Sequence, residues 1–536
     1  ITCRDWSSDV CSSDLTIRNN ITDGAGAGIS IWGFHLISGT EAYFPVITNN
    51  VIVDNQAIND EGDGAGIAVV GSSPVIAWNV IARNTATRNG GGIACWRHSF
   101  PVIANNFIVA NSASYDELTA SAGGGGIFAS ATDLDGRPIP FAISAPVIVN
   151  NVIAANGGND GGGISVVDSL YGAATIANNT IVANNGAGVY WANTSPTNDN
   201  NIVAFNARGF ERSRYFTNEA VIRFNNVFGN TVLGAPANYH ITADRTGTEG
   251  NISADPNFAN FAIGDFHIQP DSPCVNAGST ALAPSGWPDA DSQARVQGSA
   301  VDIGADESDG TTWNVPTPVV RVTPTGDDSD GSTWAKAKKT VTGGITQAAA
   351  TGGEVWVAQG MYPERVEPRA FVRLYGGFAG SETNRNQRNP AALATILDGG
   401  GTAPVVYFRN AGYRVSALDG FIVQGGGIFT GGDVFHPDLS RRTNNLLGGG
   451  IYCRVSGPMI ANSVIRSNSL GSPFNSFKVL GGGLYAYLSH AEITGNTFAH
   501  NEVLNTFDGS GGGLYSLRSL ARIERNVFRD NRAENG

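Results

Sequence analysis

The chain alternates short apolar runs with asparagine and glycine, and this pattern repeats. Residues 45–55 read PVITNNVIVDN, in which two short apolar runs are each followed by asparagine. The same eleven-residue unit returns, with small changes, at residues 74–84, 101–111, 146–156, 174–184, 458–468, 491–501 and 521–531. Short apolar runs bounded by asparagine and glycine predict short β-strands joined by turns.

A glycine cluster followed by a short apolar strand precedes most of these units. It reads GGGIACW from Gly90, GGGISVV from Gly161 and GGGLYAY from Gly481. A single unit of this size cannot bury its own apolar face, so successive units must stack as parallel strands about 4.8 Å apart. The sequence therefore predicts an all-β fold, in which the chain coils upon itself as a solenoid.

The variation within each column of the repeat shows which side chains face the core. The third position of the unit stays isoleucine, whereas the position before it includes Thr175, Glu492 and Arg522. Since side chains of a strand alternate between its two faces, the isoleucines must point inwards. These isoleucines are Ile47, Ile76, Ile103, Ile148, Ile176, Ile460, Ile493 and Ile523.

Asparagine occupies the same corner of the repeat in successive units. The column runs from Asn20 to Asn226 and has members in the late units as well. Its other members include Asn50, Asn79, Asn106, Asn151, Asn179, Asn496 and Asn526. Asparagine tolerates the left-handed backbone conformation at a strand-to-turn corner and can hydrogen-bond to the asparagine of the next coil. We predict a structural ladder; the alternative is a row of ligand-binding amides.

The composition excludes several classes of protein. Charged residues make up 15% of the chain, the formal net charge is −13, and 70 of the 536 residues are glycine. A helical bundle would need more Glu and Lys, collagen would need a three-residue glycine period, and a nucleic-acid-binding surface would need an excess of positive charge. Cys95, Cys274 and Cys453 are too few and too far apart for a disulfide framework or a zinc site. No apolar run is long enough to span a membrane.

The first fifteen residues, ITCRDWSSDVCSSDL, do not follow the repeat. They lack both an initiator methionine and the apolar region of a signal peptide. Residues 5–15 resemble one reading frame of a common sequencing-adapter oligonucleotide. We therefore expect residues 1–15 to form no strand in the first coil. The chain also ends inside a repeat, so we expect both of its solenoids to be truncated.

The periodicity fades after Asn230 and resumes late in the chain. A proline-containing stretch that includes VDIGADE at residues 301–307 predicts the closing cap of a first solenoid, residues 16–307. Residues 308–318 are polar, contain glycine and proline, and predict a linker. The new start GDDSDGSTW, from Gly326, predicts the N-terminal part of a second solenoid, residues 319–536.

These segments resemble right-handed parallel β-helix proteins of the pectin-lyase-like superfamily. Residues 272–279 and 301–307 resemble the closing segment of bacterial choice-of-anchor Q proteins, and residues 326–334 and 352–366 resemble the opening segment of such helices. The GGG-[IL]-Y clusters with the later FAHN and FRDN motifs resemble polymorphic outer-membrane-protein repeats. The resemblance implies two right-handed parallel β-helices in tandem and an extracellular or cell-surface bacterial protein. This fold hosts many functions.

The sequence predicts no catalytic residue, metal ligand or cofactor. It contains neither the WIDH-like motif of pectate lyases nor the motif set of polygalacturonases. Calcium is the one cation that short acidic loops suggest, at Asp327, Asp328 and Asp330 or at Asp133 and Asp135. The alternative for both groups is a solvated turn.

One histidine follows a glycine-cluster strand. His98, beside Trp96 and Arg97, could act as an acid or base, but no partner carboxylate is identifiable. The alternative is an exposed turn.

A column of three tyrosines gives the most specific candidate for binding. Tyr452, Tyr485 and Tyr515 each follow an inward-facing apolar residue, so they should face solvent on successive coils. Such a stripe could stack on sugar rings. The alternative is a stack of rings that stabilises the sheet itself.

The leading functional hypothesis is therefore a β-helix repeat protein that is structural or binds glycans. Its partner would be a polysaccharide or a cell-surface glycan. The alternative is a polysaccharide lyase or glycoside hydrolase of the pectin-lyase-like type. That activity would need a cleft with at least two carboxylates and an Arg, Lys or His on adjacent coils.

Overall fold

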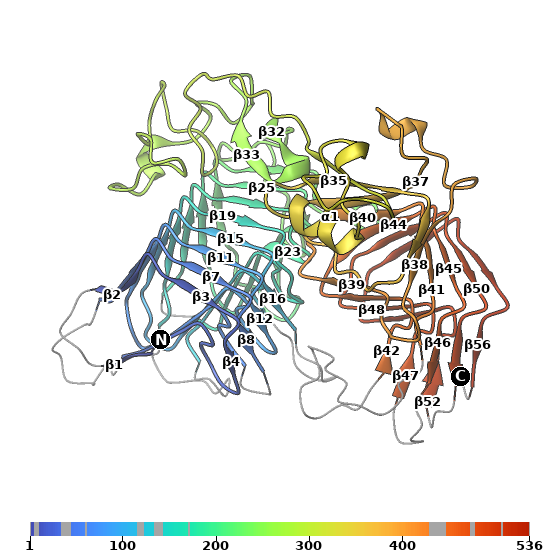
Figure 1. Ribbon diagram of the computed structural model, residues 1–536. Coiled ribbons are helices and arrows are strands. Elements are labelled where there is room, and N and C mark those ends of the chain that lie inside the picture. Colours follow the sequence, from blue (N-terminus) through green and yellow to red (C-terminus); the bar gives the residue numbers. More distant parts are fainter. Residues whose placement is uncertain are drawn as a thin grey trace. The chain divides into compact units, whose positions relative to one another are not determined.

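The computed structural model describes residues 2–4, 10–33, 44–58, 62–114, 123–132, 143–169, 172–427, 446–471, 478–504 and 508–534. The chain divides into two compact units. Unit 1 comprises Ile1–Phe261 and Asp265–Val315, and unit 2 comprises Ala262–Gly264 and Pro316–Gly536. Each unit is a stack of parallel β-strands (Figure 1), which confirms the predicted all-β solenoid class.

Each full coil of unit 1 contributes a strand to each of three long sheets, and four coils add a strand to a short fourth sheet. The first sheet contains β1 (Thr2–Arg4), β5 (Ile29–Trp32), β9 (Ile67–Val70), β13 (Ile93–Trp96), β17 (Ile127–Ser130), β20 (Ile164–Val167), β23 (Ala187–Ala192), β26 (Arg208–Arg212) and β31 (Tyr239–His240). The second contains β2 (Val10–Ser13), β6 (Val46–Thr48), β10 (Val75–Ala77), β14 (Val102–Ala104), β18 (Val147–Val149), β21 (Thr175–Ala177), β24 (Thr197–Asp199) and β27 (Val221–Arg223). The third contains β3 (Thr16–Arg18), β7 (Val51–Val53), β11 (Val80–Ala82), β15 (Phe107–Val109), β19 (Val152–Ala154), β22 (Thr180–Val182), β25 (Ile202–Ala204) and β28 (Asn226–Phe228). The fourth contains β4 (Ile21–Thr22), β8 (Gln56–Ala57), β12 (Thr85–Ala86) and β16 (Ser112–Ala113).

The core of unit 1 is a set of stacked isoleucine columns. Strand β14 pairs in register with β10 and β18, so that Ile103 lies between Ile76 and Ile148. All three side chains are fully buried, as the alternation within each strand predicts. Each coil thus covers the apolar face of its neighbour, which is why a lone repeat could not be stable.

Buried asparagines form two hydrogen-bonded ladders at two corners of the coils. The backbone N and the Nδ2 of Asn79 both donate to Oδ1 of Asn106, at 3.0 Å each. The first ladder runs through Asn50, Asn79, Asn106, Asn151, Asn179, Asn201, Asn225 and Asn251. The second runs through Asn20, Asn55, Asn84, Asn111, Asn156, Asn184, Asn206, Asn230 and Asn238. A shorter pair of ladders recurs in unit 2, where Asn496 donates to Asn526 and Asn501 to Asn531.

The residues predicted for the two ends of the asparagine column, Asn20 and Asn226, were wrong. Asn20 donates to Asn55, in the second ladder. Asn225 occupies the place predicted for Asn226, whose Nδ2 instead contacts Sγ of Cys274 at 3.1 Å. The left-handed residue is also the one before the ladder asparagine at nearly every step, as at Asn105, with φ 53°. The ladder asparagine is therefore required for its side-chain amide and not for its backbone conformation.

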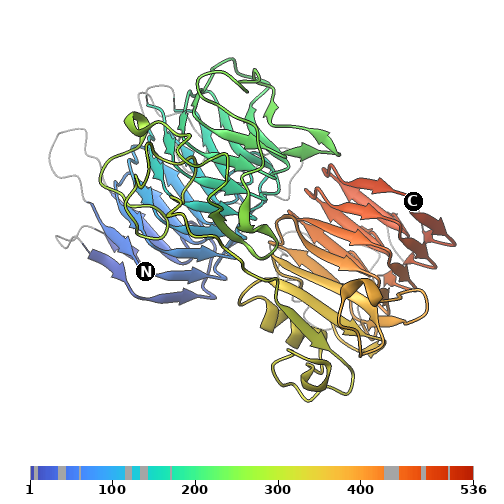
Figure 2. The same cartoon turned by 90° about the horizontal axis from the view of Figure 1, so that it is seen from above.

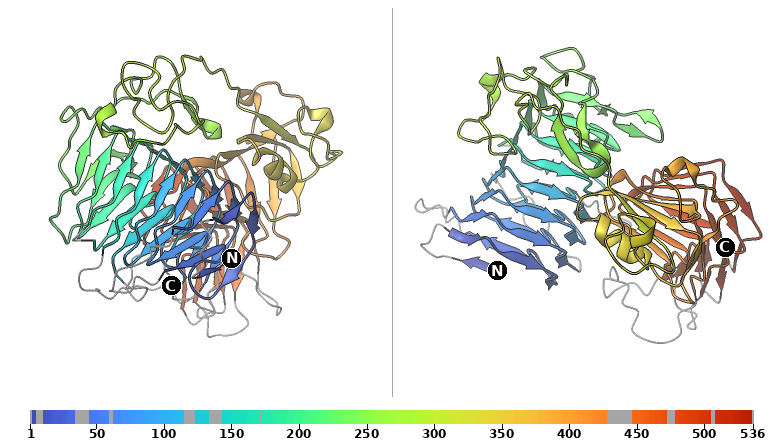
Figure 3. Two further views of the ribbon diagram at one scale, coloured as in Figure 1. Left: turned by 90° about the vertical axis from the view of Figure 1, so that its left-hand side faces the viewer. Right: turned by 45° about the horizontal axis from the view of Figure 1, so that its top comes forward.

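The closing segment of unit 1 runs back along the side of the coils as well as across their end. It contains two antiparallel strand pairs and the 3₁₀ helix η2 (Thr280–Leu282); the strands are β29 (Thr231–Val232), β30 (Ala235–Pro236), β32 (Phe258–Asn260) and β33 (Asp265–Ile268). The 3₁₀ helix η1 (Phe261–Ile263) begins at the last residue before Ala262–Gly264, which belong to unit 2. The left-handed asparagines Asn105 and Asn150 both donate from Nδ2 to the carbonyl of Pro288. Trp287 packs on Trp78, with ring centroids 5.7 Å apart. Figure 3 shows this green to olive segment beside the stacked strands.

The expectation that residues 1–15 form no strand was wrong. Strand β1 pairs in parallel with β5, and β2 pairs with β6. The second pairing shifts register between Val10 and Ser12, where the segment departs from the repeat pattern.

Unit 2 has two long sheets and three shorter ones (Figure 2). The longest contains β34 (Val319–Val322), β35 (Gly353–Ala358), β37 (Val372–Phe378), β40 (Tyr413–Asp419), β44 (Gly457–Ala461), β49 (Glu492–Thr494) and β54 (Arg522–Glu524). The next contains β36 (Gly360–Tyr362), β38 (Thr395–Asp398), β41 (Ile422–Gln424), β45 (Val464–Arg466), β50 (Thr497–Ala499) and β55 (Val527–Arg529). The three shorter sheets contain β39 (Val406–Arg409), β43 (Ile451–Arg454), β48 (Leu484–Tyr487) and β53 (Leu514–Leu517); β42 (Leu446–Leu447), β47 (Lys478–Leu480) and β52 (Asp508–Ser510); and β46 (Ser469–Gly471), β51 (Glu502–Leu504) and β56 (Arg532–Ala533).

Helix α1 (Val341–Ala348) lies against the first strands of unit 2. Its N-cap is Thr340, whose side chain accepts a hydrogen bond from the backbone N of Gly343. The buried side chains of Val341 and Ile345 join the core of the unit. Two 3₁₀ helices, η3 (Trp334–Lys336) and η4 (Arg385–Gln387), lie in loops. No helix in the described part of the chain is long and apolar enough to cross a membrane.

Candidate functional site

The tyrosine column forms a stack, but it is not exposed. The rings of Tyr452 and Tyr485 lie 5.4 Å apart and nearly parallel, and those of Tyr485 and Tyr515 lie 5.9 Å apart. The rings point away from the isoleucine and leucine core, as the alternation predicts. Tyr452 and Tyr485 are nevertheless only 2% and 4% exposed, and Tyr515 is half-buried.

A second apolar layer explains why the predicted exposure of these tyrosines was wrong. Leu447 and Leu480, on the β42–β47–β52 sheet, pack with the tyrosines in one cluster. Val455 and Leu488, in the turns that follow β43 and β48, complete it. These contacts leave Tyr452 and Tyr485 no face for a sugar ring. The stack therefore serves as an outer core that supports the sheet.

The predicted candidate His98 lies in the turn that follows β13. Trp96 is buried against Phe128, with ring centroids 4.8 Å apart, while Arg97 adopts the left-handed conformation of a turn. His98 is half-buried in that turn.

The acidic loop of unit 2 is a hydrogen-bonded turn. Oδ1 of Asp327 accepts from the backbone N of Ser329 at 3.0 Å, and Oδ1 of Asp328 accepts from that of Lys339 at 2.8 Å. These bonds are those of a solvated turn, in which carboxylates cap nearby backbone N–H groups. Asp133 and Asp135 lie outside the described residues.

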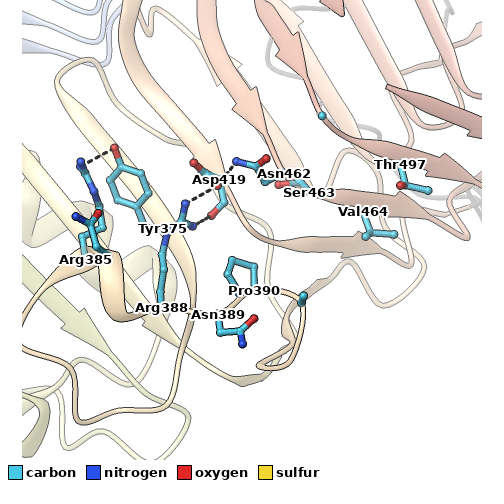
Figure 4. Close-up of a pocket in the computed structure, with 13 residues that line it drawn as sticks. Tyr375, Arg385, Arg388, Asn389, Pro390, Asp419, Asn462, Ser463, Val464 and Thr497 are labelled. Carbon is cyan, nitrogen blue, oxygen red and sulfur yellow. Dashed lines mark hydrogen bonds and ion pairs between the residues drawn. The ribbon is translucent and has the colours of Figure 1, made fainter. Parts of the chain in front are cut away.

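An open groove of about 810 Å³ lies on the outer surface of unit 2 (Figure 4). One wall is the loop that contains Arg385, Arg388 and Pro390. The floor and the other wall come from three successive coils, through Asp419, Asn462–Val464 and Gly495–Thr497. The groove thus crosses successive coils at the point where each coil turns from one long sheet of unit 2 to the other.

Glycine allows the loop to approach the coils. A Cβ atom on Gly420, which has φ 82°, would lie 2.7 Å from Cγ of Pro390 and 2.8 Å from a guanidinium nitrogen of Arg388. Residue 420 therefore needs glycine for both its backbone conformation and the space it leaves. Without this close approach the loop could not form a wall.

Asp419 organises the charged end of the groove. Its Oδ1 pairs with Nη2 of Arg388 at 2.8 Å and accepts from Nδ2 of Asn462 at 3.1 Å. The guanidinium of Arg388 also lies 5.2 Å from the centre of the Tyr375 ring. Arg385 lies over the same ring at 4.6 Å and donates to its hydroxyl at 3.1 Å. Burial raises the pKa of Tyr375, so its hydroxyl stays protonated at neutral pH.

The groove offers planar and polar groups for recognition and little for catalysis. Among the described lining residues, Asp419 supplies the one carboxylate, and it is already paired with Arg388. The cleft with two carboxylates that the enzyme hypothesis requires does not occur in this lining. The exposed amides of Asn386, Asn389 and Asn462 line the groove.

A second group of polar side chains gathers in the closing segment of unit 1. Nδ1 of His267 lies 2.6 Å from Oδ1 of Asp265, and Nε2 lies 2.9 Å from Oδ2 of Asp291. The imidazole stacks on the Trp313 ring at 4.2 Å. The hydrogen bond to Asp291 raises the pKa of His267 to about 9. Burial raises the pKa of Asp306, which lies beside them, to about 7.

Neither group was predicted from the sequence. The groove depends on a loop between β37 and β38 that has no counterpart in the repeat. The histidine group joins residues from three separate stretches of the closing segment. Only VDIGADE, at residues 301–307, could have drawn attention to the histidine group, because its acidic residues stand out in a chain that is otherwise poor in charge.

Comparison with known proteins supports the fold and leaves the function open. Residues 10–108 match the family model described as a right-handed beta helix region. A search of curated proteins finds no match. Among solved structures, a mutant of the PL6 family alginate lyase AlyGC is similar, with a TM-score of 0.32 and 11% identity over 96% of this chain and 82% of that one. Residues 10–108 thus match a right-handed β-helix model, and the sheets of both units are built from parallel strands stacked coil on coil.

Proposed function

We propose that the protein is a glycan-binding β-helix protein and that the groove of unit 2 holds an extended polysaccharide. The groove itself carries this proposal, because it is open along the coils and lined by amides, a hydroxyl, guanidinium groups and a tyrosine. Amide and guanidinium groups suit the hydroxyl and carboxylate oxygens of sugars. The buried Tyr375 ring holds these two guanidinium groups beside the groove.

The rigid coil supports the same proposal. Asp419, Asn462 and Gly495 lie at one corner of successive coils, so the hydrogen-bonded stack fixes their spacing near 4.8 Å per step. A repeating polymer could therefore meet a repeating surface. Ion pairs within the groove hold Arg385 and Arg388 in place, which limits the side-chain entropy lost on binding.

We further propose that the protein acts outside the cell or on the bacterial cell surface. The resemblance of its closing and opening segments to surface-associated β-helix families supports this location. A binding role is favoured over a polysaccharide lyase or hydrolase because the described groove lining lacks a second carboxylate.

A bulky substitution in the groove tests the binding proposal. Val464, on β45, points outward into the groove, so Val464→Trp should fill it without disturbing the core. Val527 lies in the same column on β55, is 54% exposed and does not line the groove. Val527→Trp is thus a matched control.

The full chain would be measured by affinity electrophoresis against neutral and uronic-acid polysaccharides. We expect one class of polymer to slow the wild type and Val527→Trp, and Val464→Trp to lose at least tenfold in affinity. Equal retardation of all three proteins would place binding elsewhere. Release of unsaturated or reducing ends from the polymer would favour the enzyme alternative.

A further inference from the structure

His267 lies among three carboxylates that come from separate parts of the closing segment. Asp265 is on β33 with His267, Asp291 lies in the loop that follows Trp287, and Asp306 belongs to VDIGADE. Ligand atoms of His267, Asp291 and Asp306 all lie within 4.8 Å of one another. Asp265 contacts the other ring nitrogen of the histidine.

We propose that His267, Asp291 and Asp306 bind a zinc ion that ties the closing segment of unit 1 together. This site is independent of the glycan-binding groove, which lies in unit 2. Zinc bonds to histidine nitrogen and carboxylate oxygen are about 2.0–2.2 Å long, so tetrahedral ligand atoms lie roughly 3.4 Å apart.

The arrangement around the imidazole matches that of a metal-bound histidine. A ligating histidine usually donates its second ring N–H to a carboxylate, which fixes the tautomer and the ring direction. Asp265 is placed to accept from Nδ1 at 2.6 Å, and Nε2, which lies 2.9 Å from Oδ2 of Asp291, is the nitrogen that would bind the ion. The Trp313 ring, stacked at 4.2 Å, holds the imidazole in its plane. A mixed nitrogen and oxygen set favours zinc over calcium, which prefers six to eight oxygen ligands.

The charged groups of the site also favour a bound cation. Asp306 is 8% exposed, and Oδ2 accepts one hydrogen bond, from the backbone N of Ile268 at 2.8 Å. Arg295, in the same closing segment, contacts Glu307 and donates to the carbonyls of Gly304 and Ala305. The three carboxyl groups of Asp265, Asp291 and Asp306 thus gather around one imidazole, an excess of acidic over basic groups at this point. A divalent cation would offset this excess of negative charge.

Zinc titration of the full chain, after treatment with a chelator, tests the proposal by isothermal titration calorimetry. Asp291→Asn is the central variant, because Asp291 is exposed and its loss should leave the fold intact. His267→Gln and Asp306→Asn remove the other two ligands. His240→Gln is a matched control, since His240 also pairs with a carboxylate, that of Glu211 at 2.8 Å. Among the described residues, however, His240 does not belong to a cluster of three possible metal ligands.

We expect one strong zinc site per chain in the wild type and in His240→Gln. Each of the other three variants should lose at least tenfold in affinity. Zinc should raise the thermal unfolding midpoint of the wild type and not that of Asp291→Asn. Unchanged zinc affinity in Asp291→Asn, equal loss in His240→Gln, or a site that takes calcium or magnesium in preference to zinc would each overturn the proposal. If His267→Gln fails to fold, Asp291→Asn alone decides between these outcomes.

Discussion

Nδ2 of Asn106 donates a 3.0 Å hydrogen bond to Oδ1 of Asn151, although 45 residues separate the two in sequence. The same Nδ2 also donates to the carbonyls of Ile76 and Ala104. Other repeats close the same contact over shorter spans, such as 27 residues between Asn79 and Asn106. The ladder therefore holds the corner of the coil fixed whatever the length of the loop between units.

Replacing Asn106 with alanine should destabilise unit 1 severely. The substitution removes the Oδ1 acceptor of the buried backbone N of Asn79, one of the three acceptors of its Nδ2, and the Nδ2 donor to the buried carbonyl of Ile76. Each unsatisfied group costs about 1–3 kcal/mol, so we expect a loss of about 3–5 kcal/mol in the free energy of unfolding. Urea denaturation would measure this. Asn49→Gly is the control, because Asn49 is exposed with φ 57° and should tolerate glycine. Equal stability of Asn106→Ala and wild type would contradict a structural ladder.

Replacing Tyr485 with alanine should damage the fold as much as replacing its inward neighbour, Leu484. Both side chains are buried, at 4% and 0% exposure, so each truncation leaves a cavity. We expect about 3–5 kcal/mol for Tyr485→Ala and about 2–5 kcal/mol for Leu484→Ala. Tyr485→Phe retains the stacked ring and should cost much less. Chemical denaturation of the three variants provides the test, and a neutral Tyr485→Ala would show that the ring is not part of the outer core.

The buried carboxyl of Asp63 should make stability depend on pH. Burial raises the pKa of Asp63 from 3.8 to about 6, although hydrogen bonds from Arg88 and Asn89 oppose the rise. The folded state therefore binds more protons than the unfolded state between these two pH values. The stabilisation that protonated Asp63 gives to the folded state is fully present below about pH 4 and is lost as the pH rises through about 6. The free energy of unfolding should fall by at most about 3 kcal/mol over this range.

Urea denaturation of the wild type and Asp63→Asn between pH 4 and 7 isolates this contribution, because other titrating groups are common to both. The asparagine variant should lack the decline. Parallel pH profiles for the two proteins would show that Asp63 does not hold its proton in the fold.

Adding one methyl group at Gly92 should disturb the stacking of coils. An alanine Cβ there would lie 2.6 Å from the carbonyl oxygen of Gly126 and 3.2 Å from Cγ2 of Ile108. The coils cannot separate locally without breaking ladder bonds, so we expect a loss of about 1–3 kcal/mol. Gly24→Ala is the matched control, since nothing lies within 4 Å of its added Cβ. Thermal unfolding of both variants would show whether the glycine cluster is a packing requirement.

The repeat determined the parts of this protein that each coil duplicates. Ile103 is inward because the equivalent position of the repeated eleven-residue unit is isoleucine and strands alternate, and Asn106 is a ladder residue because the same corner recurs from coil to coil. Such features are local in the sequence and become long-range only through stacking, so the pattern alone was enough to predict them. The direction of Tyr485, away from the inner core, follows from the same rule.

Only the tertiary structure decided what the repeat does not encode. The burial of Tyr485 depends on Leu447 and Leu480 in a neighbouring sheet, and alternation says nothing about a second layer. The groove and the His267 group likewise depend on loops that each occur once, and their side chains meet only when distant segments pack. Periodicity specifies a surface that is repeated, whereas a site needs contacts that are made only once.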